Sequence, residues 1–485
     1  MPERFELVIR GGAVIDGTRA PRFAADVAVR GDRIACVGRL DSVRGALEID
    51  AGGKIVAPGF IDAHTHDDRL MLSAPDVAPK VSQGITTVVA GNCGISLAPM
   101  PAGAPRPVTP PLDLLDDEGG WFRFRTFAEY VGALRDAPPA TNAALLVGHT
   151  TLRVATLDDV GRAARPPEIG RMREKVREAL AAGAIGVSTG LYYEPAAPSP
   201  TEEVIEVCRP LAEFGGLYCT HMRDEAERVL DSLEEAFRIG RAVDAQVVIS
   251  HHKVAGLPNH GRSRETLPLI ASRMRSQRIG LDCYPYCASS TVLSVARAAV
   301  ASQTLVTWSK PHPEYAGMDI AAVAAKMGVP QEAAIERLLP AGAIYFAMDE
   351  GDVQRILAFE PTMVGSDGLP HDAAPHPRLW GSFPRVLGHY ARDLGLFPLE
   401  TAVHKMTGLT ARTFGLQDRG IVKEGAYADL TIFDPGTVGE AATFARPIQA
   451  AHGIEAVIVN GALVWHEGRS TGARPGRVIA RHPCA

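Results

Sequence analysis

Hydrophobic positions in the middle of the chain form short strand-like runs that alternate with helical stretches. The helical stretches include Arg171–Ala182, Thr201–Phe214 and Glu225–Ala245. Such alternation is typical of parallel strands joined by crossover helices. Eight strand-like runs can be counted: Ile55–His66, Ile85–Cys93, Ala143–His149, Ala184–Thr189, Leu217–His221, Val247–His252, Ile279–Tyr286 and Thr362–Asp367. Eight such units predict an α/β fold of the TIM-type (β/α)8 barrel class.

The two ends of the chain are different, because there short strand-like runs follow one another across turn residues. Hairpins are predicted at Gly11-Gly12, Gly31-Asp32 and Asn460-Gly461, where glycine supplies the backbone angles of a tight turn. We therefore expect residues 1–58 and 416–480 to share one small β domain, with the barrel at residues 59–415.

Two stretches are too long or too irregular for simple connections. The segment of about 289–349 exceeds one crossover and predicts an insertion near the barrel mouth. The proline-rich stretch Pro99–Pro111 predicts a long loop, which we also expect near the mouth.

Composition narrows the possible classes of protein. The chain has 485 residues with a net charge of −6, and no basic block with interleaved aromatics that would suit a nucleic acid. No apolar run is long enough for a membrane span, and no secretory signal opens the chain. Seven scattered cysteines without a Cys-x-x-Cys pair argue against a disulfide framework and favour the cytoplasm. The pattern does not set an oligomeric state, and a monomer is compatible with it.

Polar side chains gather where the predicted barrel strands end. These positions hold His64, His66, Cys93, His149, His221, the pair His251 and His252, and Asp367. Active sites of such barrels lie at the carboxyl ends of the strands, so these side chains should meet at one rim.

The pair His64 and His66 has the spacing that places two imidazoles on the same side of a strand. Both could reach one metal ion, although two ordinary polar residues at a strand end would give the same pattern. Cys93, between glycine and asparagine neighbours, is either a small buried hydrophobe or a thiolate ligand able to bridge two ions. Because the other strand ends also carry possible ligands, metal binding is the favoured interpretation for the histidine pair and for Cys93.

Other rim residues leave alternatives open. His251 and His252 face opposite sides of a strand, so only one of them is expected to bind metal, and spacing does not choose between them. His149 could support a metal ligand from behind or be a hydrogen-bonded rim residue, and the second interpretation is favoured. Asp367, before Gly368, is either a turn aspartate or a group that binds metal or accepts a proton from water.

Several strings closely resemble the D-aminoacylases, the N-acyl-D-amino-acid deacylases of the amidohydrolase superfamily. The matching strings are Gly59-Phe-Ile-Asp-Ala-His-Thr-His, Gly91-Asn-Cys-Gly-Ile-Ser, Thr220-His-Met-Arg-Asp-Glu, Ser250-His-His-Lys and Gly365-Ser-Asp-Gly-Leu-Pro-His. The resemblance extends over essentially the whole chain, including Asp282-Cys-Tyr-Pro-Tyr and Arg378-Leu-Trp-Gly-Ser-Phe-Pro-Arg.

The resemblance implies roles for the rim residues. One tightly held zinc would be bound by Cys93, His221 and His251, and a second, weaker zinc position would use His64 and His66 with Cys93 shared. Asp367 would be the general acid and base. The fourth strand, Ala184-Ile-Gly-Val-Ser-Thr, lacks the bridging lysine of many superfamily members, which fits a cysteine bridge.

The resemblance also implies a substrate and its contacts. Lys253, Tyr284 and Arg378 would bind the substrate carboxylate, and Ser290 and Tyr192 would form walls of the side-chain pocket. We therefore predict zinc-dependent hydrolysis of N-acyl-D-amino acids, small molecules with neutral or hydrophobic side chains favoured. The alternatives are a cyclic-amide hydrolase of the dihydroorotase or hydantoinase type and a non-catalytic scaffold on the same fold.

Overall fold

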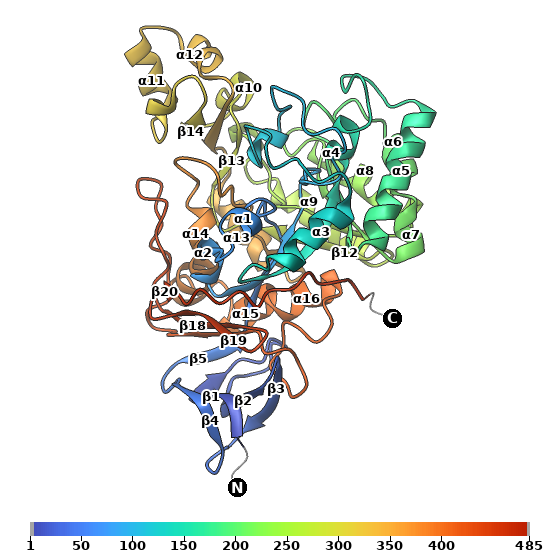
Figure 1. Cartoon of the computed structure of the whole chain (residues 1–485). Helices are drawn as coiled ribbons and strands as arrows, with labels where there is room; N and C mark the ends of the chain where they lie inside the picture. Colours follow the sequence, from blue (N-terminus) through green and yellow to red (C-terminus); the bar gives the residue numbers. More distant parts are fainter. Residues whose placement is uncertain (1–3, 483–485) are drawn as a thin grey trace.

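Eight parallel strands form the central barrel of the computed structural model, which describes residues 4–482 (Figure 1). Their order in the sheet is β16-β12-β11-β10-β9-β8-β7-β6. Their bounds are β6 Phe60–Asp62, β7 Ile85–Ala90, β8 Asn142–Gly148, β9 Gly186–Gly190, β10 Leu217–His221, β11 Gln246–Ile249, β12 Ile279–Cys283 and β16 Thr362–Val364. Nearly all their residues are buried, as in parallel sheets covered on both faces. The predicted (β/α)8 barrel is confirmed.

The barrel closes where its first and last strands meet. Beside a single parallel bridge between Thr65 and Gly368, the Ala63 amide donates to the Val364 carbonyl at 3.2 Å. The Asp367 amide donates to the His64 carbonyl at 2.8 Å. This seam therefore places the segment after β6 directly against the segment after β16.

Helices cover the barrel between its strands. Their bounds include α2 Ala78–Val81, α3 Phe127–Asp136, α4 His149–Val154, α5 Pro166–Ala181, α6 Thr201–Cys208, α7 Pro210–Phe214, α8 Val229–Ala242, α9 Ser263–Met274, α13 Glu350–Ala358, α14 Arg378–Arg385, α15 Leu399–Met406 and α16 Gly408–Phe414. The helix predicted from Glu225 begins only at Val229. Glu225 consequently lies in the loop that follows β10, at the barrel rim.

Both ends of the chain contribute to a separate nine-stranded sheet, in the order β20-β19-β18-β17-β5-β1-β2-β3 with β4 beside β1 (Figure 1). Its strands are β1 Arg4–Val14, β2 Phe23–Arg30, β3 Arg33–Gly38, β4 Arg44–Asp50, β5 Ile55–Pro58, β17 Leu430–Phe433, β18 Ile454–Val459, β19 Ala462–His466 and β20 Arg469–Ser470. The run predicted from Ile55 is thus divided, since its first part joins this sheet and only Phe60–Asp62 enters the barrel.

Two of the three predicted hairpins are confirmed, at Gly31-Asp32 and Asn460-Gly461. The hairpin predicted at Gly11-Gly12 is wrong, because β1 continues through both glycines with a shift of register against β2. A side chain at Gly12 would lie 2.5 Å from Val56 of β5, so this glycine serves close strand packing instead of a turn.

The stretch between β12 and α13 forms a small unit of its own, drawn at the upper left of Figure 1. Three antiparallel strands, β13 Ala288–Val292, β14 Thr304–Ser309 and β15 Ala341–Phe346, pack with α10 Val295–Ala298, α11 Ile320–Met327 and α12 Gln331–Leu338. The domain limits given above remain predictions.

The six cysteines within the described residues are free thiols, and Cys484 lies outside them. Over residues 4–482, none of the helices combines the length and the apolar character needed to cross a membrane.

Candidate metal centre and active site

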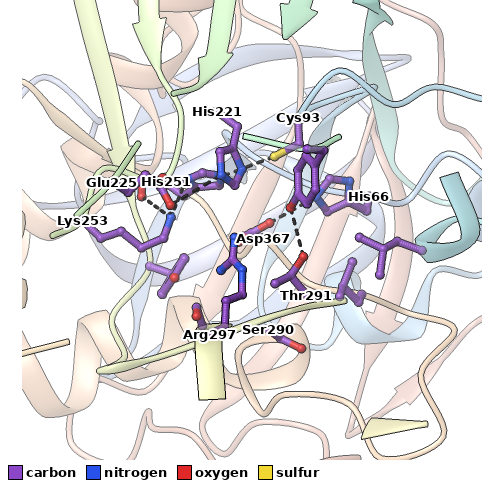
Figure 2. Close-up of a pocket in the computed structure, with 15 residues that line it drawn as sticks. His66, Cys93, His221, Glu225, His251, Lys253, Ser290, Thr291, Arg297 and Asp367 are labelled. Atoms are coloured by element: carbon purple, nitrogen blue, oxygen red, sulfur yellow. Dashed lines mark hydrogen bonds and ion pairs between the residues drawn. The ribbon is translucent and has the colours of Figure 1, made fainter. Parts of the chain in front are cut away.

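The rim residues predicted from the sequence meet in one buried pocket at the carboxyl ends of the strands (Figure 2). His66, Cys93, His221, His251 and Asp367 all line it. The pocket has a volume of about 20 Å³. The structure therefore brings together five side chains from the carboxyl ends of β6, β7, β10, β11 and β16, with His221 the last residue of β10.

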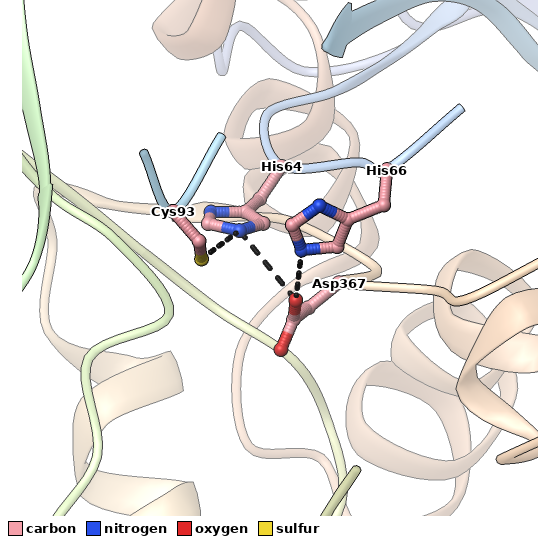
Figure 3. A group of neighbouring side chains, drawn as sticks. All are labelled: His64, His66, Cys93 and Asp367. Atoms are coloured by element: carbon pink, nitrogen blue, oxygen red, sulfur yellow. Dashed lines mark hydrogen bonds and ion pairs between the residues drawn. The ribbon is translucent and has the colours of Figure 1, made fainter. Parts of the chain in front are cut away.

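Two groups of possible metal ligands share Cys93. In one group, His64, His66, Cys93 and Asp367 offer ligand atoms within 4.8 Å of one another (Figure 3). In the other group, Cys93, His221 and His251 do the same. The Cys93 Sγ lies 3.3 Å from His64 Nε2 and 3.2 Å from His251 Nε2. The Cys93 thiol is thus common to both groups of possible ligands.

Three of these residues adopt backbone angles that ordinary side chains rarely take. Cys93, His251 and Asp367 have φ values of 52°, 36° and 50°. Such conformations cost about 1–3 kcal/mol each and persist where the surroundings impose them, commonly at active sites. The strained backbone occurs in three separate rim loops, after β7, β11 and β16, and all three side chains reach the site.

Burial favours the neutral form of three imidazoles of the site, which is the form that binds metal. It lowers the pKa of His66 to about 4, and it lowers the pKa of both His221 and His251. Neither ring nitrogen of His221 has a hydrogen-bond partner, although both are buried. An imidazole in this condition fits a ligand whose partner is a cation.

The Cys93 thiol also fits a cation. Burial, followed by the Asp367 carboxylate, raises the pKa of Cys93 well above its usual value. A thiolate at this position consequently requires a compensating positive charge, and a coordinated divalent ion deprotonates a thiol outright. Thiolate and imidazole together form the ligand set that zinc prefers.

Asp367 lies between the metal-ligand groups and a buried guanidinium. Its Oδ1 is 3.1 Å from His66 Nε2 and 3.5 Å from His64 Nε2, and its Oδ2 is 2.9 Å from Arg378 Nη1. Burial opposes ionisation, but Arg378 and then His251 hold the pKa of this carboxyl well below its usual range. Asp367 is therefore an ionised carboxylate beside the possible ligands.

A fully buried lysine holds the seam beneath the site. Lys80 Nζ donates to Asp62 Oδ2 at 2.9 Å and to Ser366 Oγ at 2.7 Å, and it lies 3.5 Å from Asp67. The Ser366 amide donates to Asp62 Oδ1 at 2.8 Å. This network ties the His64–His66 segment to the residue that precedes Asp367.

The residues predicted to contact substrate have different positions. Lys253, Tyr284 and Ser290 line the pocket, and the hydroxyls of Tyr284 and Ser290 are buried without hydrogen-bond partners. Arg378 is fully buried behind Asp367, with its guanidinium 4.6 Å from the Tyr284 ring centre and its Nη2 donating to the Ser290 carbonyl. Tyr192 does not line this pocket.

Tyr192 instead lines an outer cavity of about 710 Å³ beside the pocket. Tyr193 and Arg297 line both spaces, and the Arg297 guanidinium lies 4.0 Å from the Tyr192 ring centre. Residues of the inserted unit, including Leu293 and Leu339, form one wall of the cavity. Tyr193 and Arg297 therefore lie between the inner pocket and the outer cavity.

Sequence reasoning missed Glu225, Tyr193 and Arg297. Glu225 is 5 % exposed, lines the pocket, and accepts a hydrogen bond from Lys253 at 2.7 Å. Its position four residues after His221, at the end of a predicted strand, was the available signal. Tyr193 lies in a loop and Arg297 in the four-residue helix α10, where spacing carries little information.

Two rim histidines remain outside the groups of possible ligands. His252 points away and lies 2.9 Å from Thr266 Oγ1, so the first histidine of the pair is the one that reaches the site. His149 is fully buried with neither ring nitrogen hydrogen-bonded, which contradicts the expectation of a hydrogen-bonded rim residue. Its Nε2 lies 3.8 Å from Glu203 Oε1, on a carboxylate already paired with Arg153.

Comparison with known proteins agrees with this geometry. The model of the amidohydrolase family matches residues 47–279 and 318–465. A D-aminoacylase of Alcaligenes xylosoxydans xylosoxydans is 59% identical over 98% of both chains. An N-acyl-D-aspartate deacylase of the same organism is 53% identical over 99% of this chain and 96% of its own.

Solved structures give the same result. A D-aminoacylase studied for the roles of one and two metals in its binuclear centre is 59% identical, with a TM-score of 0.95 over 98% of this chain and 100% of its own. The N-acyl-D-glutamate deacylase of Bordetella bronchiseptica, bound to zinc and a phosphonate mimic of the tetrahedral intermediate, is 46% identical with the same TM-score and coverage.

A D-hydantoinase has a TM-score of 0.60 at 15% identity, which shows a shared fold and no more. The match to D-aminoacylases is far more specific, because it combines 59% identity with coverage of 98% of this chain. The chain belongs to the D-aminoacylase family of the amidohydrolases.

Proposed function

We propose that this chain hydrolyses the amide bond of N-acyl-D-amino acids in a zinc-dependent reaction, releasing a carboxylate and a free D-amino acid. The observation that carries the proposal is the pair of ligand groups sharing Cys93 beside the Asp367 carboxylate. The identities of 59% and 53% to D-aminoacylase and N-acyl-D-aspartate deacylase support the same chemistry.

Zinc would be held tightly by Cys93, His221 and His251, with a weaker position at His64, His66 and the shared Cys93. The buried, unpartnered nitrogens of His221 fit this assignment. When bound, zinc polarises a carbonyl and makes water a stronger nucleophile near neutral pH.

Asp367 is the proposed general base and general acid. Its carboxylate takes a proton from the attacking water and then donates that proton to the departing nitrogen, because an amine leaves poorly unless protonated. Arg378, 2.9 Å from Oδ2, orients the carboxylate and keeps it ionised before water attacks.

The α-carboxylate of the substrate would be bound by Lys253, Tyr284 and Arg378. The buried Tyr284 hydroxyl and the Nε atom of Arg378 lack hydrogen-bond partners, so donors are available for an anion. Fixing this carboxylate while the side chain passes the Ser290 wall would select one enantiomer. Tyr192, in the outer cavity, would contact the outer part of a neutral or hydrophobic side chain.

The test is amine release from N-acetyl-D-methionine and its L enantiomer, using chelator-treated protein with and without restored zinc. We expect zinc-dependent release from the D form alone. Release that does not depend on zinc would contradict the metal assignment. Equal release from both enantiomers would contradict the stereochemical role of the carboxylate contacts. Ring opening of hydantoin without linear amidase activity would establish the cyclic-amide alternative.

A further inference from the structure

Glu225 lies where the proposed metal ligands meet the proposed carboxylate contact (Figure 2). Its Oε1 is 3.0 Å from His251 Nδ1 and 2.7 Å from Lys253 Nζ. Its Oε2 is 3.5 Å from His221 Nε2. One buried carboxylate therefore faces two possible zinc ligands and one possible substrate contact.

The contacts of the His251 ring show which of its two nitrogens needs a hydrogen-bond acceptor. Its Nε2 faces Cys93 Sγ at 3.2 Å, which makes Nε2 the nitrogen available to a cation. The ring proton then belongs on Nδ1, and Glu225 Oε1 is the acceptor beside it. A carboxylate in this place fixes both the protonated nitrogen and the orientation of the ring.

The Lys253 ammonium needs the same oxygen. Its Nζ lies 2.7 Å from His251 Nδ1, so two donors stand at contact distance. Oε1 of Glu225 can accept from both, and the His251 carbonyl accepts a further bond from Lys253 at 3.1 Å. Without the carboxylate, the two donors would repel one another and Lys253 would leave its position.

Glu225 is itself held firmly although it lies in a loop. Its backbone carbonyl accepts from the Ala255 amide at 2.7 Å, which joins the loop after β10 to the loop after β11. The neighbouring Asp224 amide donates to Ser232 Oγ of α8 at 3.0 Å. The two anchored loops keep the carboxylate at a fixed distance from both donors.

We propose that Glu225 is a positioning residue that couples the metal centre to substrate recognition, because one of its oxygens holds both the His251 ring and the Lys253 ammonium. The substrate half of this inference rests on the proposed function, since it assigns Lys253 to the α-carboxylate. The metal half depends only on His251 as a ligand.

The metal half is tested by zinc affinity, measured by competition with a chromophoric chelator. Glu225→Gln should weaken zinc binding about 10- to 100-fold, the usual effect of losing a carboxylate behind a histidine ligand. Glu235→Gln is the matched control, because Glu235 pairs with Arg223 outside the pocket. It should leave the zinc dissociation constant within about threefold of the original value.

The substrate half is tested at saturating zinc by comparing N-acetyl-D-methionine with its α-carboxamide. Glu225→Gln should reduce the preference for the carboxylate, as a ratio of kcat/KM values, by about 10- to 100-fold. Lys253→Met should reduce it similarly, and the double variant should fall no further, because both changes remove one contact. A purely structural defect would slow both substrates alike and leave the ratio unchanged.

Unchanged zinc affinity in Glu225→Gln would overturn the proposal, and so would losses that multiply in the double variant. If Glu225→Gln does not fold, Glu225→Asp serves instead, because it keeps the carboxylate but shortens the side chain by one methylene. Intermediate losses are then expected in zinc affinity and in the preference for the carboxylate substrate. No change in either measurement with Glu225→Asp would also overturn the proposal. Failure of the proposed function would appear separately, as no hydrolysis by the original protein, and the zinc titration would still test the metal half.

Discussion

At the residue scale, the position of Asp367 separates proton transfer from metal retention. Asp367→Asn should lower kcat about 10²- to 10⁴-fold, because the variant can neither take the proton from water nor return it to nitrogen. Zinc should remain in the protein, since Cys93, His221 and His251 form a ligand group without Asp367. Metal analysis together with steady-state kinetics checks both expectations.

Asp372→Asn is the matched control, because Asp372 is a buried aspartate in the same loop that does not contact the proposed ligands. Its kcat should stay within a few-fold of the original value. Near-normal turnover by Asp367→Asn would remove Asp367 from the mechanism.

His149 provides a pH prediction at the same scale. Burial, and then the Arg153 guanidinium, lower the pKa of His149 to about 3. The unfolded chain takes up this proton near pH 6.5, so the folded state loses stability as the pH falls from 6.5 towards 3. The loss is about 1.4 kcal/mol per pH unit below 6.5 for this group.

His149→Gln removes the titrating group from this position. The free energy of unfolding of the original protein, relative to that of the variant, should therefore fall by roughly 2 kcal/mol between pH 7 and pH 5. Denaturant unfolding at the two pH values measures this difference. Parallel pH profiles for the two proteins would show that His149 does not titrate with a lowered pKa.

At the element scale, Lys80 of α2 joins the ends of β6 and β16 through Asp62 and Ser366. Lys80→Met should destabilise the fold by about 3–5 kcal/mol, because it leaves buried carboxylates without their partner. It should also lower kcat in the remaining folded protein, since the His64–His66 segment is no longer fixed against Asp367.

Lys405 offers a matched control at the opposite end of β16, where its ammonium donates to the carbonyls of Phe359, Glu360 and Thr362. Lys405→Met should lower the Tm while kcat below the transition is retained. Equal kcat losses in the two variants would show that Lys80 supports the fold alone.

Elements differed in how far they could be predicted from sequence. The barrel strands were predictable because parallel strands buried on both faces leave long apolar runs. The limit between β5 and β6 was not, since Ile55 and Phe60 are equally apolar and enter different sheets. Glu225 continued a helical pattern, but its contacts with His251 and Lys253 draw it into the rim loop.

The candidate site was predictable where spacing reflects geometry, as in His64 and His66. It was not predictable where partners are distant in sequence. Lys80 pairs with Ser366 across 286 residues, and no local pattern identifies that contact. The position of Glu225 between His251 and Lys253 likewise depends on contacts between the loops after β10 and β11.

At the scale of the whole molecule, the C-terminal segment crosses the end of the barrel opposite the site. The amides of Gly476, Ile479 and His482 donate to carbonyls of Pro139, Ala143 and Gly415, and the Ala143 amide donates to the Arg477 carbonyl. Ending the chain at Ser470 should remove roughly 2–6 kcal/mol of unfolding free energy from these four bonds.

Denaturant unfolding of the shortened chain measures this loss, and circular dichroism before the transition verifies that the barrel has formed. An unchanged midpoint would show that the segment rests on the barrel without stabilising it.

The small volume of the inner pocket has a consequence for the rate at which substrate binds. About 20 Å³ is room for a water molecule and far too little for an acylated amino acid. Substrate must therefore bind a conformation in which side chains that line the inner pocket have moved apart. The observed affinity then equals the affinity of that open conformation multiplied by its population. Side chains that hold the inner pocket closed can thus govern KM by changing how often the molecule opens.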